Sequence, residues 1–421
     1  MPKKNPQTIA EKIISSHTDR DVTAGELAVV DVDLAYVQDT TGPLAVRQLE
    51  KMGLTAVAHP KRTILFLDHA APSPRSELSN DHMLLRAFAK RTGALLSDVG
   101  EGISHELVAE RYAAPGMIIV GADSHTCTGG ALGAFATGMG SSDIAAAFGL
   151  GKTWLRAPKT LLARLTGELP KGVYAKDVIL HLIGTIGAEG ANYMALQFTG
   201  DALPRFPMSG RITVANMAVE CGAKAGLFPG DDVTRDYLKA MGRANDFKPL
   251  DADKGAKYER EITIALSKLA PTIAKPHFVD NTTTVDKIGE VKVDQVFLGS
   301  CTNGQAEDFR VAASILKSRR VAEGTRLICA PPSRKVLLDI IADGSYQALV
   351  GAGAAFVAPG CGACLGVHCG VLGDSEVCLA TQNRNFQGRM GNPKGFIYLA
   401  SPAVAAATAI KGKIADPREF L

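Results

Sequence analysis

Three short segments that have the pattern of strands are each followed by a loop that carries polar side chains capable of chemistry. The loops are Asp123-Ser124-His125 after residues 117–120, Cys301-Thr302-Asn303 after residues 291–298, and Cys361-Gly362-Ala363-Cys364 after residues 354–358. Short β-branched runs predict buried strands, and residues 305–317 have the apolar spacing of a helix, with Asn303 as its expected N-cap. Strands that alternate with helices form α/β layers, in which functional sites lie at the carboxyl ends of the strands. We therefore expect an α/β protein with its site at these loops.

The length and the charge balance limit the class of protein further. The chain has 421 residues, with 46 Lys and Arg against 43 Asp and Glu and a formal net charge of +3. A chain of this length predicts two or three domains, and the turn at Pro158 and the linker 275–284 give expected domains of 1–157, 158–284 and 285–421. The near-neutral balance argues against nucleic-acid binding. No apolar run reaches the ~18 residues of a membrane span and no signal peptide is recognised, which predicts a cytoplasmic protein.

The eight cysteines are more typical of thiols or metal ligands than of disulfides, since the chain is long and has no recognised secretion signal. Four of them are expected to be small buried apolar residues: Cys127, Cys221, Cys329 and Cys378. Cys361 and Cys364 form a C-x-x-C pair whose sulfurs can face one metal. Three kinds of site compete for this pair: a zinc site completed by His368 and Cys369, a thioredoxin-like redox pair, and an iron–sulfur cluster. The sequence favours the cluster, because Cys301 offers a third thiolate in another strand-end loop.

Four motifs, in this order, resemble the aconitase superfamily. They are Asp123-Ser124-His125-Thr126, Gly299-Ser300-Cys301-Thr302-Asn303-Gly304, Gly360-Cys361-Gly362-Ala363-Cys364-Leu365-Gly366 and Asn383-Arg384-Asn385-Phe386-x-Gly388-Arg389. The length and the closing segments 398–402 and 416–418 resemble the separate large subunits of 3-isopropylmalate dehydratase and homoaconitase. The resemblance covers essentially the whole chain, and it implies three α/β domains of the aconitase type around a cluster-bearing cleft.

The resemblance also implies a cofactor and a set of catalytic groups. By similarity, Cys301, Cys361 and Cys364 hold a [4Fe–4S] cluster with one open iron, which acts as a Lewis acid on the substrate hydroxyl. Three imidazole–carboxylate pairs match the family and would handle protons: Asp68 with His69, His105 with Asp123, and His125 with Glu220.

A second set of residues is expected to bind the substrate. Arg384 and Arg389 match the carboxylate-binding arginines of the family, and their guanidinium groups suit bidentate binding of a carboxylate. The resemblance further suggests Gln38, Ser124, Asn216, Asn303 and Asn383 as residues that orient the cluster or the substrate.

The expected reaction is the reversible dehydration and rehydration of a hydroxy di- or tricarboxylic acid. The resemblance favours 3-isopropylmalate, an intermediate of leucine biosynthesis, ahead of homocitrate or homoaconitate, 2,3-dimethylmalate and an aconitase-like substrate. The mobile fourth domain of the superfamily is not recognised in the sequence. We therefore expect a separate small subunit to supply this swivel domain, with its serine base and further arginines.

Two other classes of protein make different predictions. Gly151-Lys152-Thr153 resembles the end of a phosphate-binding P-loop, but Ala146 stands where the first required glycine would be. A non-catalytic binding module stabilised by zinc would be colourless, whereas an iron–sulfur protein is brown.

Overall fold

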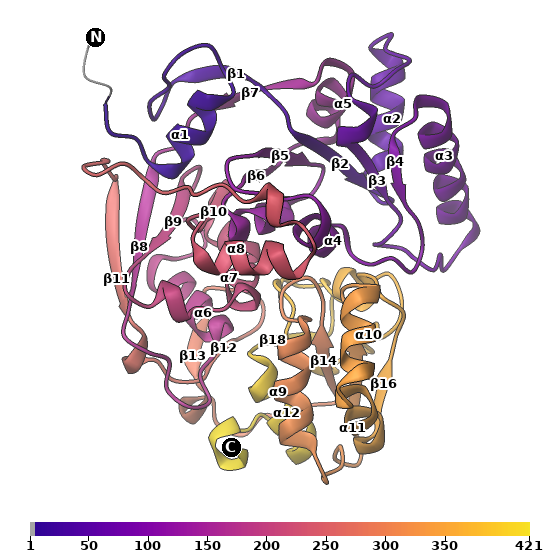
Figure 1. Ribbon diagram of the computed structural model, residues 1–421. Coiled ribbons are helices and arrows are strands. Elements are labelled where there is room, and N and C mark those ends of the chain that lie inside the picture. The colour runs from indigo at the N-terminus through magenta and orange to yellow at the C-terminus, as the bar shows by residue number, and fades with distance from the viewer. Residues whose placement is uncertain (1–4) are drawn as a thin grey trace.

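The computed structural model describes residues 5–421, and its first sheet has five parallel strands in the order β4-β3-β2-β5-β6. These strands are β2 (Leu34–Gln38), β3 (Thr63–Phe66), β4 (Leu95–Ser97), β5 (Ile118–Gly121) and β6 (Phe135–Gly138). The helices of this region are α2 (Gly42–Lys51), α3 (Ser76–Thr92), α4 (Ser104–Arg111) and α5 (Ser141–Leu150). The central strands β2, β3 and β5 are buried along their whole length, as expected of a sheet covered on both faces (Figure 1).

The second sheet has four parallel strands in the order β10-β9-β8-β11. The strands are β8 (Thr160–Thr166), β9 (Ala195–Thr199), β10 (Ala225–Leu227) and β11 (Arg260–Ala265). The helices of this region are α6 (Ala175–Ile186), α7 (Met208–Asn216) and α8 (Asp232–Ala240). A short 3₁₀ segment, Met217–Cys221, continues α7 and carries Glu220.

The third sheet has seven strands in the order β13-β12-β18-β17-β14-β15-β16. Its strands are β12 (Thr272–Ala274), β13 (Thr282–Thr284), β14 (Gln295–Gly299), β15 (Arg326–Ala330), β16 (Ala354–Phe356), β17 (Val377–Ala380) and β18 (Phe396–Leu399). Its helices are α9 (Ala306–Leu316), α10 (Arg334–Ala342), α11 (Ser345–Ala352) and α12 (Pro402–Lys411). Only the pairs that involve β12 are antiparallel; β14 to β18 pair in parallel.

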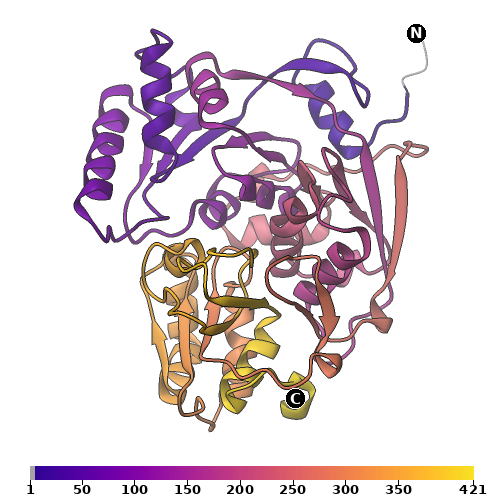
Figure 2. The same ribbon diagram turned by 180° about the vertical axis from the view of Figure 1, so that it is seen from behind.

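The remaining α-helix is α1 (Ile9–Ser16), and the remaining strands, β1 (Leu27–Asp31) and β7 (Lys152–Arg156), form an antiparallel ribbon. Figures 1 and 2 show the three sheets and their helices grouped around the middle of the molecule, with α9 to α12 on the side opposite to α2 and α3. The expected α/β class with parallel sheets is confirmed. The domain boundaries at 157/158 and 284/285 stay a prediction.

The helix expected at residues 305–317 is present as α9, but its N-cap differs from the prediction. Gln305 occupies the N-cap, because its backbone N–H donates to the Asp308 carboxylate and the two residues form a capping box. Asn303 lies in the loop before it, so the prediction of Asn303 as the cap is wrong. Phe309, Ala312, Ala313 and Leu316 form the buried face of α9, with the spacing of an amphipathic helix.

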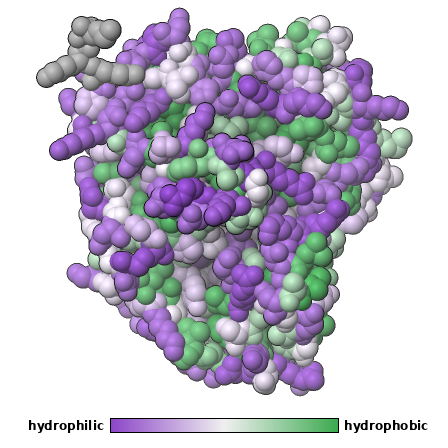
Figure 3. All heavy atoms as spheres, in the orientation of Figure 1, coloured by the Kyte–Doolittle hydropathy of each residue, from purple (hydrophilic) through white to green (hydrophobic). Residues whose placement is uncertain are grey.

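One cluster of buried apolar side chains joins the three sheets, and it includes Phe66, Phe198 and Phe297. The polar site described below is therefore held by elements that share a core. Within residues 5–421, no helix is both long and apolar enough to cross a membrane. The face seen in Figure 3 mixes hydrophilic side chains with smaller hydrophobic patches.

Candidate active site

Loops after the carboxyl ends of parallel strands carry most of the predicted site residues. β3 leads to Asp68 and His69, β5 to Asp123 and His125, β14 to Cys301, β16 to Cys361 and Cys364, and β17 to Asn383 and Arg384. At the end of β14, Gly299 has a φ of +135°, and a Cβ there would lie 2.8 Å from the carbonyl carbon of Ala330. Only glycine permits this close approach, which turns the chain from β14 into the Cys301 loop.

Three imidazoles converge on the carboxylate of Asp123. His105 Nε2 lies 3.1 Å and His125 Nδ1 3.3 Å from Asp123 Oδ1, and His69 Nε2 lies 3.8 Å from Oδ2. Burial opposes ionisation of this carboxyl group, but His105 and His125 outweigh burial and hold the pKa of Asp123 well below its ordinary value. Asp123 is therefore an anion that orients the imidazoles around it.

His69 is bound by the carboxylate next to it in the sequence. Its Nδ1 lies 2.9 Å from Asp68 Oδ1, and Asp68 Oδ2 accepts a hydrogen bond of 2.6 Å from the backbone N–H of Ser104. Burial favours the neutral imidazole, but the charge and hydrogen bond of Asp68 outweigh burial and raise the pKa of His69 to about 10. His69 is therefore an imidazolium at neutral pH, with its Nε2–H directed toward Asp123.

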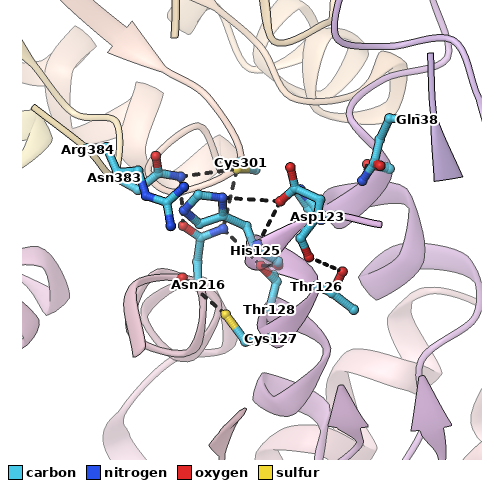
Figure 4. A network of polar contacts seen from close by, with 12 residues as sticks. Gln38, Asp123, His125, Thr126, Cys127, Thr128, Asn216, Cys301, Asn383 and Arg384 are labelled. Atoms are coloured by element: carbon cyan, nitrogen blue, oxygen red, sulfur yellow. Dashed lines mark hydrogen bonds and ion pairs between the residues drawn. The ribbon is translucent and has the colours of Figure 1, made fainter. Parts of the chain in front are cut away.

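The third predicted pair continues into an arginine. His125 Nε2 lies 2.9 Å from Glu220 Oε1, and Arg384 Nε donates to both oxygens of Glu220 at 2.8 and 3.0 Å. Burial opposes ionisation of Glu220, but His125 and Arg384 outweigh burial, and the pKa of Glu220 is lowered. Figure 4 shows His125 and Arg384 approaching the same region as Cys301. The structure thus brings together all three imidazole–carboxylate pairs that the sequence predicted.

The three predicted cluster cysteines are buried, and polar side chains donate to two of them. Asn216 Nδ2 lies 3.3 Å and Asn383 Nδ2 3.8 Å from Cys301 Sγ, while Arg389 Nη2 lies 3.6 Å from Cys364 Sγ (Figure 4 for Cys301). The hydrogen bond from Cys361 and the charge of Arg389 outweigh burial and lower the pKa of Cys364 to about 5. Amide and guanidinium donors of this kind stabilise thiolate ligands.

These surroundings fit an iron–sulfur cluster. Asn383 Oδ1 and Arg389 Nε are buried and have no hydrogen-bond partner among residues 5–421, which is rare for buried polar atoms unless another group is bound nearby. Thiolates are the usual ligands of such clusters. A zinc site would need a fourth ligand, and Cys369, one of the two candidates for it, is exposed.

The loop of Cys361 and Cys364 also contacts the loop of Asp68 and His69. The backbone N–H of Cys361 donates to the carbonyl oxygen of Asp68 at 2.9 Å. A Cβ at Gly360 would lie 3.1 Å from that same oxygen, so the two loops are in close contact. The thiols of the third sheet therefore lie next to the Asp68–His69 pair of the first.

Lys176, on α6, is a residue of the site region that the sequence reasoning missed. Its side chain is fully buried, and its Nζ donates to the carbonyl oxygens of Thr381 at 2.7 Å and Gln382 at 2.6 Å. These carbonyls immediately precede Asn383. Nothing in the sequence distinguishes Lys176 from an ordinary exposed lysine in the first turn of a helix.

Three further predicted residues lie in different places around the site. Gln38 donates to Ser104 Oγ at 3.3 Å and is fully buried. Asn303 donates to Thr213 Oγ1 and Asp308 Oδ1, and its Oδ1 faces Lys176 Nζ at 3.4 Å. Ser124 lines a cavity of about 450 Å³ together with Asp123 and Trp154. Their roles toward a substrate stay predictions.

Asp39 and His82 form a supporting pair behind His69. Asp39 accepts hydrogen bonds of 2.9 Å from the backbone N–H groups of His69 and Ala70, and His82 Nε2 lies 2.9 Å from Asp39 Oδ2. All of these side chains are buried. His82 thus reaches the His69 loop through Asp39.

The chain is similar to known proteins over almost its whole length. The sequence model of the Aconitase family (aconitate hydratase) matches residues 11–290 and 282–412. The 3-isopropylmalate dehydratase large subunit of Elusimicrobium minutum is 61% identical over 416 residues, covering 99% of this chain and 100% of that protein. The large subunit 2 of Archaeoglobus fulgidus is 53% identical over 415 residues, with the same coverage.

A solved structure supports the fold alone. The crystal structure of Thermococcus kodakaraensis aconitase X in its holo form aligns with a TM-score of 0.51 and 13% sequence identity, covering 92% of each chain. The family match and the close relatives confirm the resemblance seen in the four motifs, and they imply a hydro-lyase with an iron–sulfur cluster. The chain belongs to the aconitase family.

Proposed function

We propose that this chain is the large subunit of a 3-isopropylmalate dehydratase, the hydro-lyase of leucine biosynthesis. The observation that carries the proposal is the convergence of three imidazoles on Asp123 beside the three buried thiols. Relatives that match the chain over 99% of its length are 3-isopropylmalate dehydratase large subunits. The proposed reaction removes water from a hydroxy dicarboxylic acid and adds it back with the hydroxyl on the adjacent carbon.

The proposed cofactor is a [4Fe–4S] cluster held by Cys301, Cys361 and Cys364. When bound, its iron without a protein ligand supplies a Lewis acid for the substrate hydroxyl and one carboxylate. Asn216 and Asn383 hold Cys301, and Arg389 holds Cys364, through the hydrogen bonds described above. Their donors offset the negative charge of the thiolates in a buried site.

His69 is the proposed proton donor to the leaving hydroxyl. Asp68 keeps the His69 imidazole charged, so the proton is available throughout the neutral pH range. The Asp123 carboxylate faces Nε2 of His69 at 3.8 Å and of His105 at 3.1 Å, and its charge stabilises a proton on either nitrogen. The proton therefore leaves from a ring whose orientation is fixed at Nδ1 by the contact with Asp68.

Arg384 and Arg389 are the proposed anchors of the substrate carboxylates. Glu220 binds Arg384 through Nε, and no hydrogen bond in residues 5–421 uses the two terminal nitrogens of Arg384. A guanidinium held at Nε presents its outer edge in a fixed plane, which suits a carboxylate. Arg389 is already directed at Cys364, so it would bind the carboxylate closest to the cluster.

The second part of the proposal concerns a partner. The relatives are named as large subunits, which implies a small subunit, and we assign to that subunit the swivel domain with the serine base that takes the proton from carbon. Cytoplasmic localisation is part of the same proposal. The choice of substrate among 3-isopropylmalate, homoaconitate, 2,3-dimethylmalate and aconitate, which differ in their substituents, would then depend on both subunits.

An anaerobic reconstitution tests the proposal directly. The full chain is loaded with iron and sulfide, mixed with a candidate small subunit, and assayed with each of the four substrates. We expect brown protein and highest kcat/KM for 3-isopropylmalate, with no turnover by the chain alone. Cys301→Ser should lose colour and activity together, whereas Cys329→Ser, which changes a buried cysteine of the apolar core, should keep both. Full turnover without the small subunit, or a stable zinc protein without iron, would refute it.

A further inference from the structure

The hydroxyl group of Tyr36 contacts the side of His105 that faces away from Asp123. Tyr36 Oη lies 3.0 Å from His105 Nδ1, whereas the opposite ring nitrogen, Nε2, lies 3.1 Å from Asp123 Oδ1. Both aromatic side chains are buried. Tyr36 lies two residues before Gln38 on β2, so the two side chains point to the same face of the sheet, toward the start of α4.

The position of the Tyr36 ring is closely defined by its neighbours. Phe66 packs edge-on against it with a centroid distance of 5.6 Å. On β5, a Cβ at Gly121 would lie 2.7 Å from Tyr36 Cζ, so the ring occupies space that only glycine leaves free. The phenol is therefore held in one place, and the orientation of its O–H is the main freedom that it keeps.

The contact with Asp123 determines what His105 Nδ1 must do. Asp123 is a carboxylate, so His105 Nε2 carries a proton in both the neutral and the charged ring. Nδ1 then accepts a hydrogen bond when the ring is neutral and donates one when the ring is charged. A partner that serves both states must be able to donate and to accept, which a hydroxyl can do.

Thr126 makes the exchange possible. Its Oγ1 and the Tyr36 ring both border the space above Gly121, and its own hydroxyl proton is donated to the carbonyl oxygen of Asp123 at 2.7 Å. When His105 Nδ1–H donates a hydrogen bond to Tyr36 Oη, the Tyr36 hydroxyl can in turn donate its hydrogen bond to Thr126 Oγ1. We propose that Tyr36 is a positioning residue that holds His105 against Asp123 in both protonation states of the imidazole.

Other charged and titratable groups around His105 do not replace this contact. The His69 and His125 rings lie 6.1 and 6.0 Å away between centroids, and the Asp68 carboxylate binds Ser104 N–H and His69. Glu106, the next residue of α4, binds Gln305. Tyr36 is thus the polar partner that the structure gives to His105 Nδ1, and burial keeps the phenol neutral because the pKa of Tyr36 is raised well above its ordinary value.

The experiment compares Tyr36→Phe with Tyr237→Phe in the reconstituted full chain labelled with ¹⁵N-histidine. Tyr237 is the matched control, because its hydroxyl is buried and has no hydrogen-bond partner among residues 5–421. Long-range ¹H–¹⁵N spectra follow the His105 ring against pH, with His105→Gln used for assignment. In Tyr36→Phe we expect the titration midpoint of His105 to fall by about one pH unit, because a hydrogen bond to a charged group contributes about twice as much as a neutral one. Tyr237→Phe should leave it unchanged.

Two further readings keep the proposal testable if Tyr36→Phe does not fold. In the unmodified chain, neutral His105 should carry its proton on Nε2, and a proton on Nδ1 instead would overturn the proposal. Thr126→Val should lower the His105 midpoint in the same direction, while an unchanged midpoint in this variant or in folded Tyr36→Phe would also overturn it. The role of Tyr36 in turnover rests on the dehydratase function proposed above, and it is measured separately, as a matching shift in the pH profile of kcat. The imidazole spectra do not depend on that function.

Discussion

Asn216 is the best single position at which to test how the thiols are supported. Its amide is completely used: Nδ2 donates to Thr128 Oγ1 at 2.9 Å and to Cys301 Sγ at 3.3 Å, while Oδ1 accepts from Thr302 and Asn383. The side chain is fully buried. Asn216→Asp keeps the shape of the side chain but replaces the donor that faces the sulfur with an acceptor oxygen.

The size of the effect follows from the distance between the two groups. Two like charges 3.3 Å apart repel by about 5 kcal/mol at the effective dielectric constant of ~20 that suits protein sites. Even half of that repulsion would weaken cluster retention by roughly 70-fold, since 1.36 kcal/mol corresponds to a factor of ten. We therefore expect the variant to fold and to lose its cluster.

The assay measures iron and acid-labile sulfide per chain after anaerobic reconstitution and desalting, with a thermal melt to report folding. The matched control is Asn245→Asp, which adds the same charge at an exposed position. The control should retain iron and sulfide like the unmodified chain. Equal cluster content in folded Asn216→Asp would refute the argument that this amide supports Cys301.

Four shorter predictions follow from other contacts. Asp68→Asn removes the charge that raises the pKa of His69 to about 10, so the alkaline limb of the pH profile of kcat should move to lower pH. An unchanged limb would show that titration of His69 does not cause it. Lys176→Met leaves two buried carbonyls without a donor and should lower the free energy of unfolding by roughly 1–3 kcal/mol in denaturant titrations. An unchanged free energy of unfolding would contradict a stabilising role for these two hydrogen bonds. Burial raises the pKa of Glu106, so the native chain loses stability as pH rises toward that pKa, and Glu106→Gln should melt higher than the unmodified chain at pH 8 but not at pH 5. Brief alkylation of the folded protein should label Cys369, the exposed cysteine, before any other, as peptide mass spectrometry would show.

The strand-end loops of the fold could be predicted from the sequence because their signals are local. The short segments with a strand pattern before Asp123, Cys301 and Cys361 form β5, β14 and β16, and parallel pairing places their loops at carboxyl ends. The N-cap of α9 was missed because Asn303 and Gln305 both precede the helix. The choice was decided by the capping box between Gln305 and Asp308.

The polar contacts between distant segments could not be predicted in the same way. Lys176, Tyr36 and His82 are ordinary residues of regular elements in the sequence, and their roles arise from packing between segments far apart along the chain. Tyr36 and His105, for example, are separated by 69 positions. The three imidazole–carboxylate pairs were expected only because the motifs resembled a known family, since neither periodicity nor spacing links His125 to Glu220.

The most direct test of the central claim is the ⁵⁷Fe Mössbauer spectrum of the anaerobically reconstituted chain in complex with its small subunit, recorded with and without 3-isopropylmalate. Coordination by Cys301, Cys361 and Cys364 alone predicts about four irons per chain and a substrate-induced change confined to about one iron in four. A spectrum that the substrate leaves unchanged, or that persists when Cys361 and Cys364 are both replaced by serine, would contradict the account.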